Sequence, residues 1–308
     1  MESETESECP VLDEKNMDLF IEYIAERHSI HKKRVRHEPA PWTEDPILLK
    51  WKFTNVFREI DPGTKYVIDR IIPSLKADPV NLVFNVIVYR IYNKIETMNA
   101  IGFLDVAHYD KLKVLSILKG IVSGGGRVFT NAFLVSSMSW IDGGRKQKRS
   151  KVERSCILIE RISDVLPDLV ADIQRETDSE FTYKSLLKLN GIGPFLAYQI
   201  AVDLGYWNER IFDENQFVVA GPGAKSGVNR LFKDRKGMSY EQCIGHLCAV
   251  QSQWFERSGV SMERLFGDRR VKALNLMAME NCLCEISKYL KVHYGERGRP
   301  RNRYKAAK

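Results

Sequence analysis

The stretch AGPGAKSGVNRLF, residues 220–232, contains the residue types that hold phosphate groups in proteins. Glycines expose backbone N–H groups, and a lysine adds a positive charge beside them. A nucleotide-binding P-loop has the form G-x-x-x-x-G-K-[ST], whereas this stretch is shorter and has Ala224 in place of the second glycine. It therefore predicts an anion site that does not take a nucleoside triphosphate, with a structural turn as the alternative. The residues expected to hold the anion are Gly221, Gly223, Ala224, Lys225, Ser226 and Arg230, with Ser226 capping the helix that follows.

A second candidate site is the segment LLKLNGIGPFLAYQIAVDLGYW, residues 186–207. Its glycines lie between two apolar runs in the pattern L-x-G-I-G-x-x-x-A, which is typical of a helix-hairpin-helix. In such a motif the uncovered hairpin amides and the start of the second helix bind a DNA phosphate without reading a base. We therefore expect Asn190, Gly191 and Gly193 to contact DNA, and an ordinary connection between two helices is the alternative.

The hairpin and the residues after it resemble the helix-hairpin-helix DNA glycosylase superfamily. In those enzymes the catalytic aspartate follows the second hairpin glycine by about twenty residues, and here Asp213 lies 20 residues after Gly193. Two features differ from that pattern. Phe195 stands where lyase-type members have a Schiff-base lysine, and the four regularly spaced cysteines of the iron–sulfur members are missing. The resemblance implies a DNA-binding helical scaffold with Asp213 at its site.

Longer motifs resemble a narrower, phage-type family. These are the amino acid:DNA transferases, also called α-glutamyl/putrescinyl-thymine pyrophosphorylases, and closely similar sequences are labelled as the helical domain of the 5-hydroxymethyluracil DNA kinase. The motifs are PWTEDPILLKWKFTNVFREIDPGTKYVI, VYRIYNKIET, GGRVFTNAF, LNGIGPFLAYQI, FVVAGPGAKSGVNRLF and MENCLCEISKYLKVHYGERGRPRNRY, and they span about residues 17–305. The resemblance implies a transferase that replaces the pyrophosphate of pyrophosphorylated 5-hydroxymethyluracil in DNA with an amine. Because the chain has no Walker A loop, we do not expect the kinase activity itself.

The implied reaction needs a neutral amine, and an α-amino group with a pKa near ~8 is mostly protonated at pH 7. The resemblance makes Asp213 the candidate general base, with Glu214 as its substitute, although a structural role for Asp213 is equally open. Lys225 is expected to neutralise the leaving pyrophosphate. The sequence does not identify the amine, because glycine, glutamate, lysine and putrescine all supply the required nitrogen.

Two segments carry polar residues at helical spacing beside apolar faces. They are Lys52, Asn55 and Glu59 on an expected helix at 46–60, and Asn85, Tyr89, Asn93 and Glu96 on an expected helix at 80–98. Asparagine and tyrosine are unusual on a solvated face, so the pattern predicts a buried polar network or a pocket wall. The residues assigned to a substrate pocket are Lys52, Asn55, Arg58, Tyr89 and Asn93. For Arg58 and for Arg90, buried ion pairs with Glu59 or Glu96 are the alternative to binding a carboxylate or a phosphate.

A base inside a duplex must be flipped out before it can react. Trp42, Phe129 and Tyr198 are candidates to stack on it, and packing in the core is the alternative for each. The histidines show no metal-ligand spacing, and the cysteines show no C-x-x-C pair. We therefore expect no metal and no cofactor.

Helical periodicity dominates the chain, and alternating strand patterns are scarce. We predict an all-α fold of the helix-hairpin-helix glycosylase type. The expected organisation is a disordered acidic N-terminus over 1–16, a single helical domain over 17–290 that contains the helix-hairpin-helix at 186–205, and a basic C-terminal arm over 291–308.

The charge distribution favours a nucleic-acid partner. The net charge is +7, and the last eighteen residues carry seven bases, among which Arg299, Arg301 and Arg303 are expected to bind DNA phosphates. No stretch approaches the ~18 consecutive apolar residues of a membrane helix, and a secretion signal is missing, so we expect a protein of the host cytoplasm, or of the nucleus in a eukaryote. Expected partners are DNA with a pyrophosphorylated base, a free amine or amino acid, and a DNA-base kinase. The alternatives are a glycosylase that excises a modified base and a non-catalytic DNA-binding partner of such a kinase.

Overall fold

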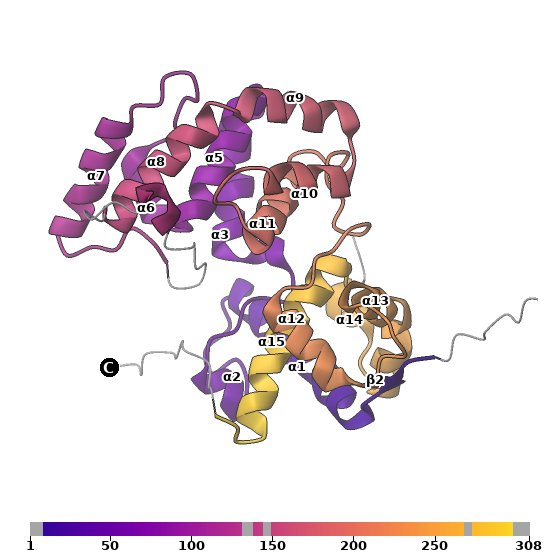
Figure 1. Ribbon diagram of the computed structural model, residues 1–308. Helices are drawn as coiled ribbons and strands as arrows, with labels where there is room; N and C mark the ends of the chain where they lie inside the picture. The colour runs from indigo at the N-terminus through magenta and orange to yellow at the C-terminus, as the bar shows by residue number, and fades with distance from the viewer. Residues whose placement is uncertain (1–8, 131–137, 144–148, 268–272, 298–308) are drawn as a thin grey trace, which may run out of the picture. The chain divides into compact units, whose positions relative to one another are not determined.

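The computed structural model describes residues 9–130, 138–143, 149–267 and 273–297, and the structural statements below concern these residues. Helices form nearly all of the regular structure (Figure 1). The exception is a short antiparallel pair of strands, β1 (Val11–Leu12) and β2 (Phe232–Asp234). The predicted all-α fold class is confirmed. None of the described helices has the length and apolar character needed to cross a membrane.

The chain forms two compact units. The first combines Met1–Asp61 with Val218–Lys308, and the second is the continuous segment Pro62–Phe217. The sequence had predicted one helical domain over 17–290, whereas each unit packs around helices of its own. The boundary expected at residue 17 also falls inside a helix, because Asp13 caps that helix by accepting a hydrogen bond from the Asn16 backbone N–H at 3.0 Å.

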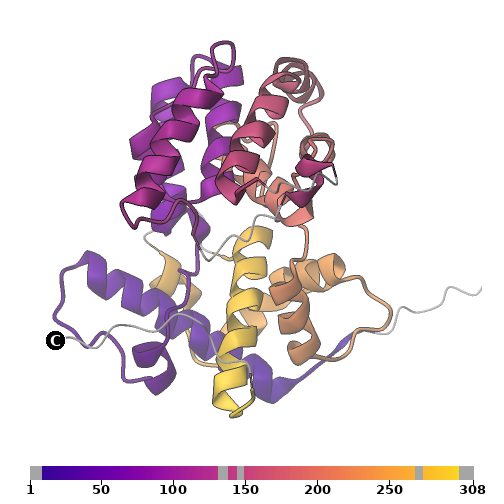
Figure 2. The ribbon, with the colours of Figure 1, turned by 60° about the vertical axis from the view of Figure 1, so that its left-hand side comes forward.

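In the first unit, α12 packs along α15, and the two helices lie side by side in Figures 1 and 2. Side chains of α1 and α15, such as Ile24 and Leu283, are fully buried in its core. The helices of this unit are α1 (Glu14–Val35), α2 (Pro46–Lys50), η1 (Arg58–Ile60), α12 (Pro222–Leu231), α13 (Tyr240–Arg257), α14 (Met262–Phe266) and α15 (Leu276–His293).

The second unit is built around α5, which is buried along most of its length. Helices α8, α9 and α11 pack against it. The helices of this unit are α3 (Pro62–Tyr66), η2 (Val67–Ile71), α4 (Ile72–Leu75), α5 (Pro79–Tyr92), α6 (Ile95–Ile101), α7 (Lys111–Ser123), η3 (Ser139–Asp142), α8 (Lys151–Ser163), α9 (Leu166–Glu176), α10 (Ser179–Leu187) and α11 (Pro194–Gly205).

The helix predicted at 46–60 is wrong over most of its length. Helix α2 ends at Lys50, and the chain then runs extended from Trp51, with buried and exposed side chains alternating up to Thr54. The extended path is stabilised by Asp61, whose carboxylate accepts a hydrogen bond from the backbone N–H of Asn55 at 3.0 Å. Lys52, Asn55 and Glu59 therefore do not share a helical face.

The helix predicted at 80–98 is interrupted at Asn93. The N–H of this residue still donates to the Tyr89 carbonyl at 2.5 Å, as in a helix. Its backbone then adopts a left-handed conformation with φ of 48°, and this conformation ends α5. Asparagine tolerates this conformation better than most residues. The chain resumes as α6, so Glu96 does not continue the polar stripe of α5 and has a mostly exposed side chain.

Candidate functional site

Helices α10 and α11 are joined by a tight turn at 188–193, where the sequence predicts a DNA-binding hairpin. Gly191 has a φ of +90°, and an added Cβ would lie 2.8 Å from the Leu158 side chain. Only glycine fits a site with both constraints. The turn is closed by the Ile192 N–H, which donates to the Leu189 carbonyl at 3.0 Å.

The outer surface of this turn is open to solvent. Asn190, Gly193 and Pro194 are exposed, and Phe195 is 45% exposed although it is a large apolar residue. Gly193 is the N-cap of α11, and its amide makes no described backbone hydrogen bond. The positive end of α11 therefore faces solvent at an exposed glycine, an arrangement that can bind a phosphate.

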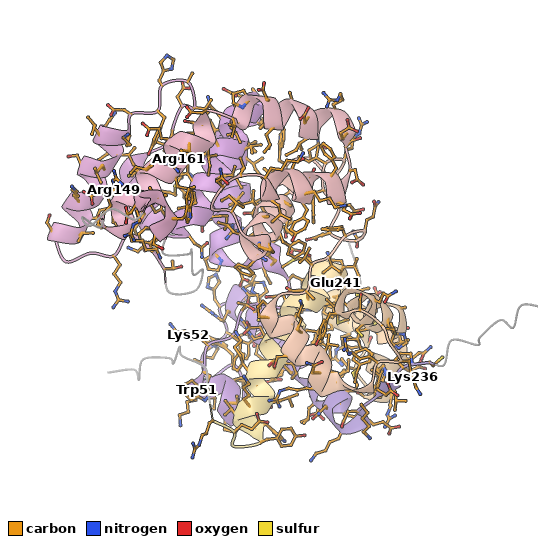
Figure 3. All side chains as sticks on the ribbon, viewed as in Figure 1. Trp51, Lys52, Arg149, Arg161, Lys236 and Glu241 are labelled. Atoms are coloured by element: carbon orange, nitrogen blue, oxygen red, sulfur yellow. The ribbon has the colours of Figure 1, made fainter. Side chains whose placement is uncertain are left out.

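A basic pocket lies in the same unit as the turn. It has a volume of about 260 Å³ and is lined by Asp142, Arg149 and Arg161, and the two arginines are labelled in Figure 3. The Arg161 guanidinium lies 5.4 Å from the ring centre of Trp140, which is 44% exposed. The same indole would be 3.3 Å from a Cβ added at Gly191, so Trp140 abuts the turn. The exposed Trp140 indole, with Arg161 against it, extends the surface that can contact nucleic acid, whereas Arg149 is ion-paired with Asp142 at 3.4 Å.

Asp213 forms a local turn. Its Oδ1 accepts two hydrogen bonds from Asn215, from the backbone N–H and from the side-chain amide, both at 2.8 Å. Its own N–H donates to the Ser179 Oγ at 2.9 Å. Glu214 accepts a hydrogen bond from the Tyr206 hydroxyl at 3.2 Å. These bonds give Asp213 a structural role, and its catalytic role stays a hypothesis.

Tyr89 and Asn93 both line a hollow of about 420 Å³ in the second unit, together with Gly63, Lys94 and Thr130. Tyr89 is itself buried, so little of its side chain is open to this hollow, and a substrate-binding role for the two residues stays a prediction.

Arg90, beside this hollow, is held in a buried ion pair. Its guanidinium donates two hydrogen bonds to Asp203, one of them at 2.8 Å, and a third to Asn93 at 2.9 Å. Arg90 therefore forms a buried ion pair with Asp203, whereas the sequence prediction had offered Glu59 or Glu96 as the partner.

The stretch at 220–232 lies in the first unit, and its glycines have a different role from the one predicted. Helix α12 already begins at Pro222, so Gly223 is inside the helix, as is Gly227. A Cβ at Gly223 would overlap with Cys284, and one at Gly227 would overlap with the backbone of Leu283. These glycines allow α12 to approach α15 closely.

Two carboxylates already occupy the amides that precede α12. The Gly221 N–H donates to Glu280 at 3.1 Å, and the Ala220 N–H donates to Glu241 at 3.0 Å. A carboxylate at this position complements the positive end of the helix. In this structure the groups at these amides are carboxyl side chains of the protein, and an anion site for a ligand stays a prediction.

Lys225, Ser226 and Arg230 point to different partners. Lys225 is exposed, and its ammonium lies 5.3 Å from the ring centre of Tyr240. Ser226 is in the second turn of α12 and hydrogen-bonds Ser287 at 2.7 Å, so its predicted capping role is wrong because the helix begins four residues earlier. Arg230 forms a bidentate ion pair with Glu296 at 2.6 and 2.9 Å. The structure does not gather the three around one anion.

Asn55 lies at the centre of a polar network in the first unit. Its side-chain amide donates to Asp61 at 2.8 Å, and its carbonyl Oδ1 accepts from Arg27 at 2.7 Å. Burial raises the pKa of the Asp61 carboxyl, although the hydrogen bonds from Asn55 and the charge of Arg27 oppose the shift. The sequence prediction left a network or a pocket wall open for Asn55, and the described contacts are those of a network. Lys52, in contrast, is exposed (Figure 3).

Glu280 is a buried carboxyl with a strongly raised pKa. It is 7% exposed, and burial raises its pKa to about 7 despite the Gly221 hydrogen bond and the charge of Arg58, which lower the pKa, while Glu285 raises it further. A carboxyl with this pKa exchanges a proton near neutral pH and can act as a general acid or base. Arg58 is also buried, so a cation and a proton acceptor lie in one region of the first unit.

Comparison with known proteins identifies the family. The family described as "5-hmdU DNA kinase, helical domain" matches residues 14–298. The chain belongs to this family. The predicted resemblance to the helical-domain family is thereby confirmed.

A relative of this 5-hmdU DNA kinase helical domain is found among curated proteins. It is a protein of Bacillus phage SP10 named 5-hmdU DNA kinase, which is 28% identical over 294 residues. The match covers 91% of this chain and 46% of the relative, so the chain spans about half the length of the protein it matches. None of the solved structures matches this chain.

Sequence reasoning missed Glu280 and Trp140. Glu280 was detectable, because it lies three residues from both Met277 and Leu283 on the apolar side of α15, where a carboxylate is unexpected. Trp140 gave no signal, because its neighbour Gly191 is distant in sequence.

Three predicted DNA-binding residues, Arg299, Arg301 and Arg303, lie outside the described residues. The arm they belong to stays a prediction. Among the described residues, no group of three or more His, Cys, Asp or Glu side chains is placed to hold a metal ion.

Proposed function

We propose that this protein modifies thymine-derived bases in DNA by replacing the pyrophosphate of 5-pyrophosphoryloxymethyluracil with an amine. Membership of the 5-hmdU DNA kinase helical-domain family supports a substrate of hydroxymethyluracil type. The observation that carries the chemistry is the carboxyl of Glu280, which is buried at the start of α12, near the Arg58 cation, with a pKa of about 7.

The proposed step is a substitution at the methylene carbon of the base. The amine nitrogen forms a bond to this carbon while the carbon–oxygen bond breaks, and pyrophosphate departs with the electron pair. The proton lost by the nitrogen passes to a carboxylate. A base with a pKa near the working pH is the most effective acceptor. Glu280 meets this condition, and Asp213 is the second candidate acceptor, because of the resemblance to glycosylases.

DNA contact is assigned to the turn between α10 and α11. The exposed Gly193 at the start of α11 suits a phosphate oxygen, and Trp140 and Arg161 extend this surface. Flipping the base costs a few kcal/mol, which such backbone contacts help to offset. Lys225, exposed in the first turns of α12, is proposed to neutralise the leaving pyrophosphate.

The deciding experiment incubates the full chain with DNA that contains the pyrophosphorylated base and with a mixture of labelled amines, followed by mass spectrometry of the nucleosides. A transferase gives an amine-substituted nucleoside and an intact backbone. Abasic sites instead would assign a glycosylase, which is the alternative supported by the superfamily resemblance.

Two variants test the choice of base. We expect Glu280→Gln to lower the rate of amine transfer by about 10²-fold or more and to remove the rise in rate through pH 7. Asp213→Asn is the matched comparison, and a larger loss in that variant would assign the base to Asp213.

For the anion, Lys225→Ala should abolish conversion and leave DNA affinity unchanged. Lys233→Ala, an exposed lysine of β2, is the control.

A second candidate function is a DNA-binding helical part that assists a kinase without catalysing a reaction. The length of the phage relative supports it, since the match covers 46% of a protein named as a kinase. In this case the chain binds DNA, yields no product with any amine, and increases the activity of a 5-hydroxymethyluracil DNA kinase added to the same reaction.

A further inference from the structure

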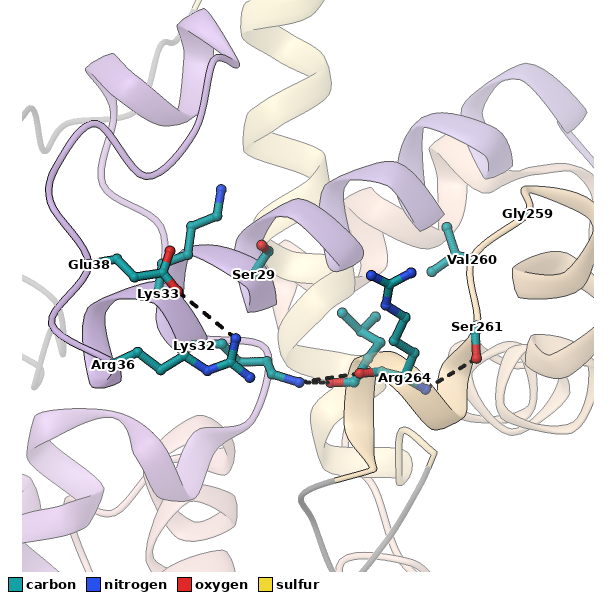
Figure 4. Close-up of a pocket in the computed structure, with 10 residues that line it drawn as sticks. Ser29, Lys32, Lys33, Arg36, Glu38, Gly259, Val260, Ser261 and Arg264 are labelled. Atoms are coloured by element: carbon teal, nitrogen blue, oxygen red, sulfur yellow. Dashed lines mark hydrogen bonds and ion pairs between the residues drawn. The ribbon is translucent and has the colours of Figure 1, made fainter.

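A second basic pocket lies in the first unit, where the end of α1 faces α14 (Figure 4). Its volume is about 510 Å³. The charged side chains among its described lining residues are Lys32, Lys33, Arg36, Arg264 and Glu38. Four cations and a single carboxylate line the pocket, so its potential is strongly positive.

Two of the cations are fixed by the fold. The Lys32 ammonium donates to the carbonyls of Arg264 and Leu265, at 3.3 and 3.2 Å (Figure 4). The Lys33 ammonium donates to the Trp42 carbonyl at 2.8 Å. Their charges are thus held at the pocket by neutral carbonyl oxygens.

The two arginines are more available for a ligand. Arg36 is 65% exposed and reaches Glu38 only at 3.9 Å. The Arg264 side chain is exposed, and its guanidinium has no hydrogen-bond or ion-pair partner in the described part of the chain. Guanidinium groups bind phosphate in bidentate fashion, and phosphate is therefore the anion that this pair favours.

The lining also decides which part of a nucleic acid fits. No aromatic side chain is among the described lining residues, so the pocket offers no surface on which a base could stack. The volume exceeds the size of a single phosphate group, and the pocket is open to solvent. We propose that this pocket binds phosphates of the DNA backbone and adds a contact that is separate from the turn between α10 and α11. The inference rests on the proposed function only in that DNA is the substrate.

The test is a salt titration of DNA binding with the full chain. We expect the double variant Arg36→Ala/Arg264→Ala to bind a labelled duplex oligonucleotide roughly tenfold more weakly at moderate salt. The slope of log K against log salt should become shallower by about 2, since each phosphate contact contributes about 0.9. Both side chains are exposed, so circular dichroism should show an unchanged fold. An unchanged slope overturns the inference.

The control is Lys65→Ala/Lys119→Ala, which removes the same charge from exposed lysines that are ion-paired with Asp69 and Glu153, each at 2.9 Å. An equal loss of slope in this control means a general charge effect and also overturns the inference. Arg36→Lys/Arg264→Lys should keep the slope, because the charge is retained, and lose part of the affinity, because bidentate contacts are lost.

Binding of free pyrophosphate is the last measurement. If pyrophosphate binds the native chain but not Arg36→Ala/Arg264→Ala, and both proteins bind DNA with equal affinity, the pocket is a site for the small anion and the proposal is wrong. Failure of the proposed function gives a different result. In that case the slope changes as expected, but no amine-substituted nucleoside forms.

Discussion

Glu280 shows how its surroundings convert an ordinary glutamate into a group that titrates near neutral pH. Burial disfavours the charged carboxylate, and the hydrogen bond from the Gly221 N–H does not fully compensate. The result is a pKa of about 7 in the folded chain, well above the ordinary value of a glutamate carboxyl, 4.5. The ionised form therefore costs folding free energy, and carboxyls with such a shift are found most often at functional sites.

Replacing Glu280 should therefore stabilise the protein at neutral pH. Below pH 4.5 the carboxyl is protonated in both the folded and the unfolded chain, and its titration contributes nothing to stability. As pH rises from 4.5 to about 7, the unfolded chain loses the proton first, so the folded state is progressively destabilised, by about 3 kcal/mol above pH 7. Glu280→Gln retains an oxygen acceptor for the Gly221 N–H. Its free energy of unfolding should exceed that of the native chain by more at pH 8 than at pH 5.

Urea denaturation at the two pH values measures this difference. The control is Glu256→Gln, which changes an exposed glutamate near the end of α13. If Glu280→Gln and the native chain show the same dependence of stability on pH, the buried carboxyl does not titrate as described.

Among the elements, the pair α12 and α15 depends on the absence of side chains. Gly223 and Gly227 are four residues apart in α12, and a Cβ added at either would overlap with α15, at Cys284 and at the Leu283 backbone. A phosphate loop and a close helix contact use the same residue, because both need backbone without a Cβ. Sequence alone does not separate these two uses of glycine.

Gly227→Ala should destabilise the protein. The added methyl group would overlap with the Leu283 carbonyl, a backbone atom that cannot rotate away, so α12 and α15 must separate. We expect a loss of about 1–3 kcal/mol. Gly245→Ala in α13 is the matched control, because nothing lies within 4 Å of an added Cβ there. That change should stabilise the protein by about 0.5–1 kcal/mol. Thermal unfolding of both variants is the measurement, and equal melting temperatures would contradict the packing role.

For the whole molecule, the main finding is that the chain forms two units, only one of which is continuous in sequence. Pro62–Phe217 contains its own buried helix α5 and the turn between α10 and α11. The other unit needs Met1–Asp61 together with Val218–Lys308, and Asn16 at one end bonds Arg230 and Tyr294 at the other. This discontinuous unit can therefore fold only when residues that are distant in sequence come into contact.

We therefore expect residues 62–217 to fold when expressed alone and to bind duplex DNA. A helical circular dichroism spectrum and one cooperative thermal transition would support this expectation, whereas residues 1–61 alone should remain unfolded. Gly191→Ala in the isolated segment should weaken DNA binding, because the Cβ would meet Leu158 and the turn must change shape. Equal DNA affinity with and without this change would contradict the role of the turn.

The failures of the sequence predictions have local causes. The prediction of a helix at 46–60 did not take account of Asp61. The Asp61 carboxylate accepts hydrogen bonds from the backbone N–H and the side-chain amide of Asn55, and these bonds hold the chain extended. The helix predicted at 80–98 did not allow for a left-handed Asn93. Ser226 was expected as a cap because Pro222 was not recognised as the first residue of the helix. In each case one hydrogen bond or one dihedral angle outweighed an apolar periodicity that was otherwise sound.

The sequence by itself determined the helical fold class, the family, and the turn at Asn190–Gly193, since periodicity and glycine spacing are properties of neighbouring residues. Only the tertiary structure revealed that Glu280 holds the Gly221 amide, that Trp140 abuts Gly191, and that Arg36 and Arg264 line one pocket. These pairs are separated by tens to hundreds of residues, and a pKa or a pocket depends on burial and on distances that only the packed chain sets. The stretch at 220–232 shows both contributions. Its composition indicated a preference for anions, and the fold assigned its glycines to helix packing and its first amides to two glutamates.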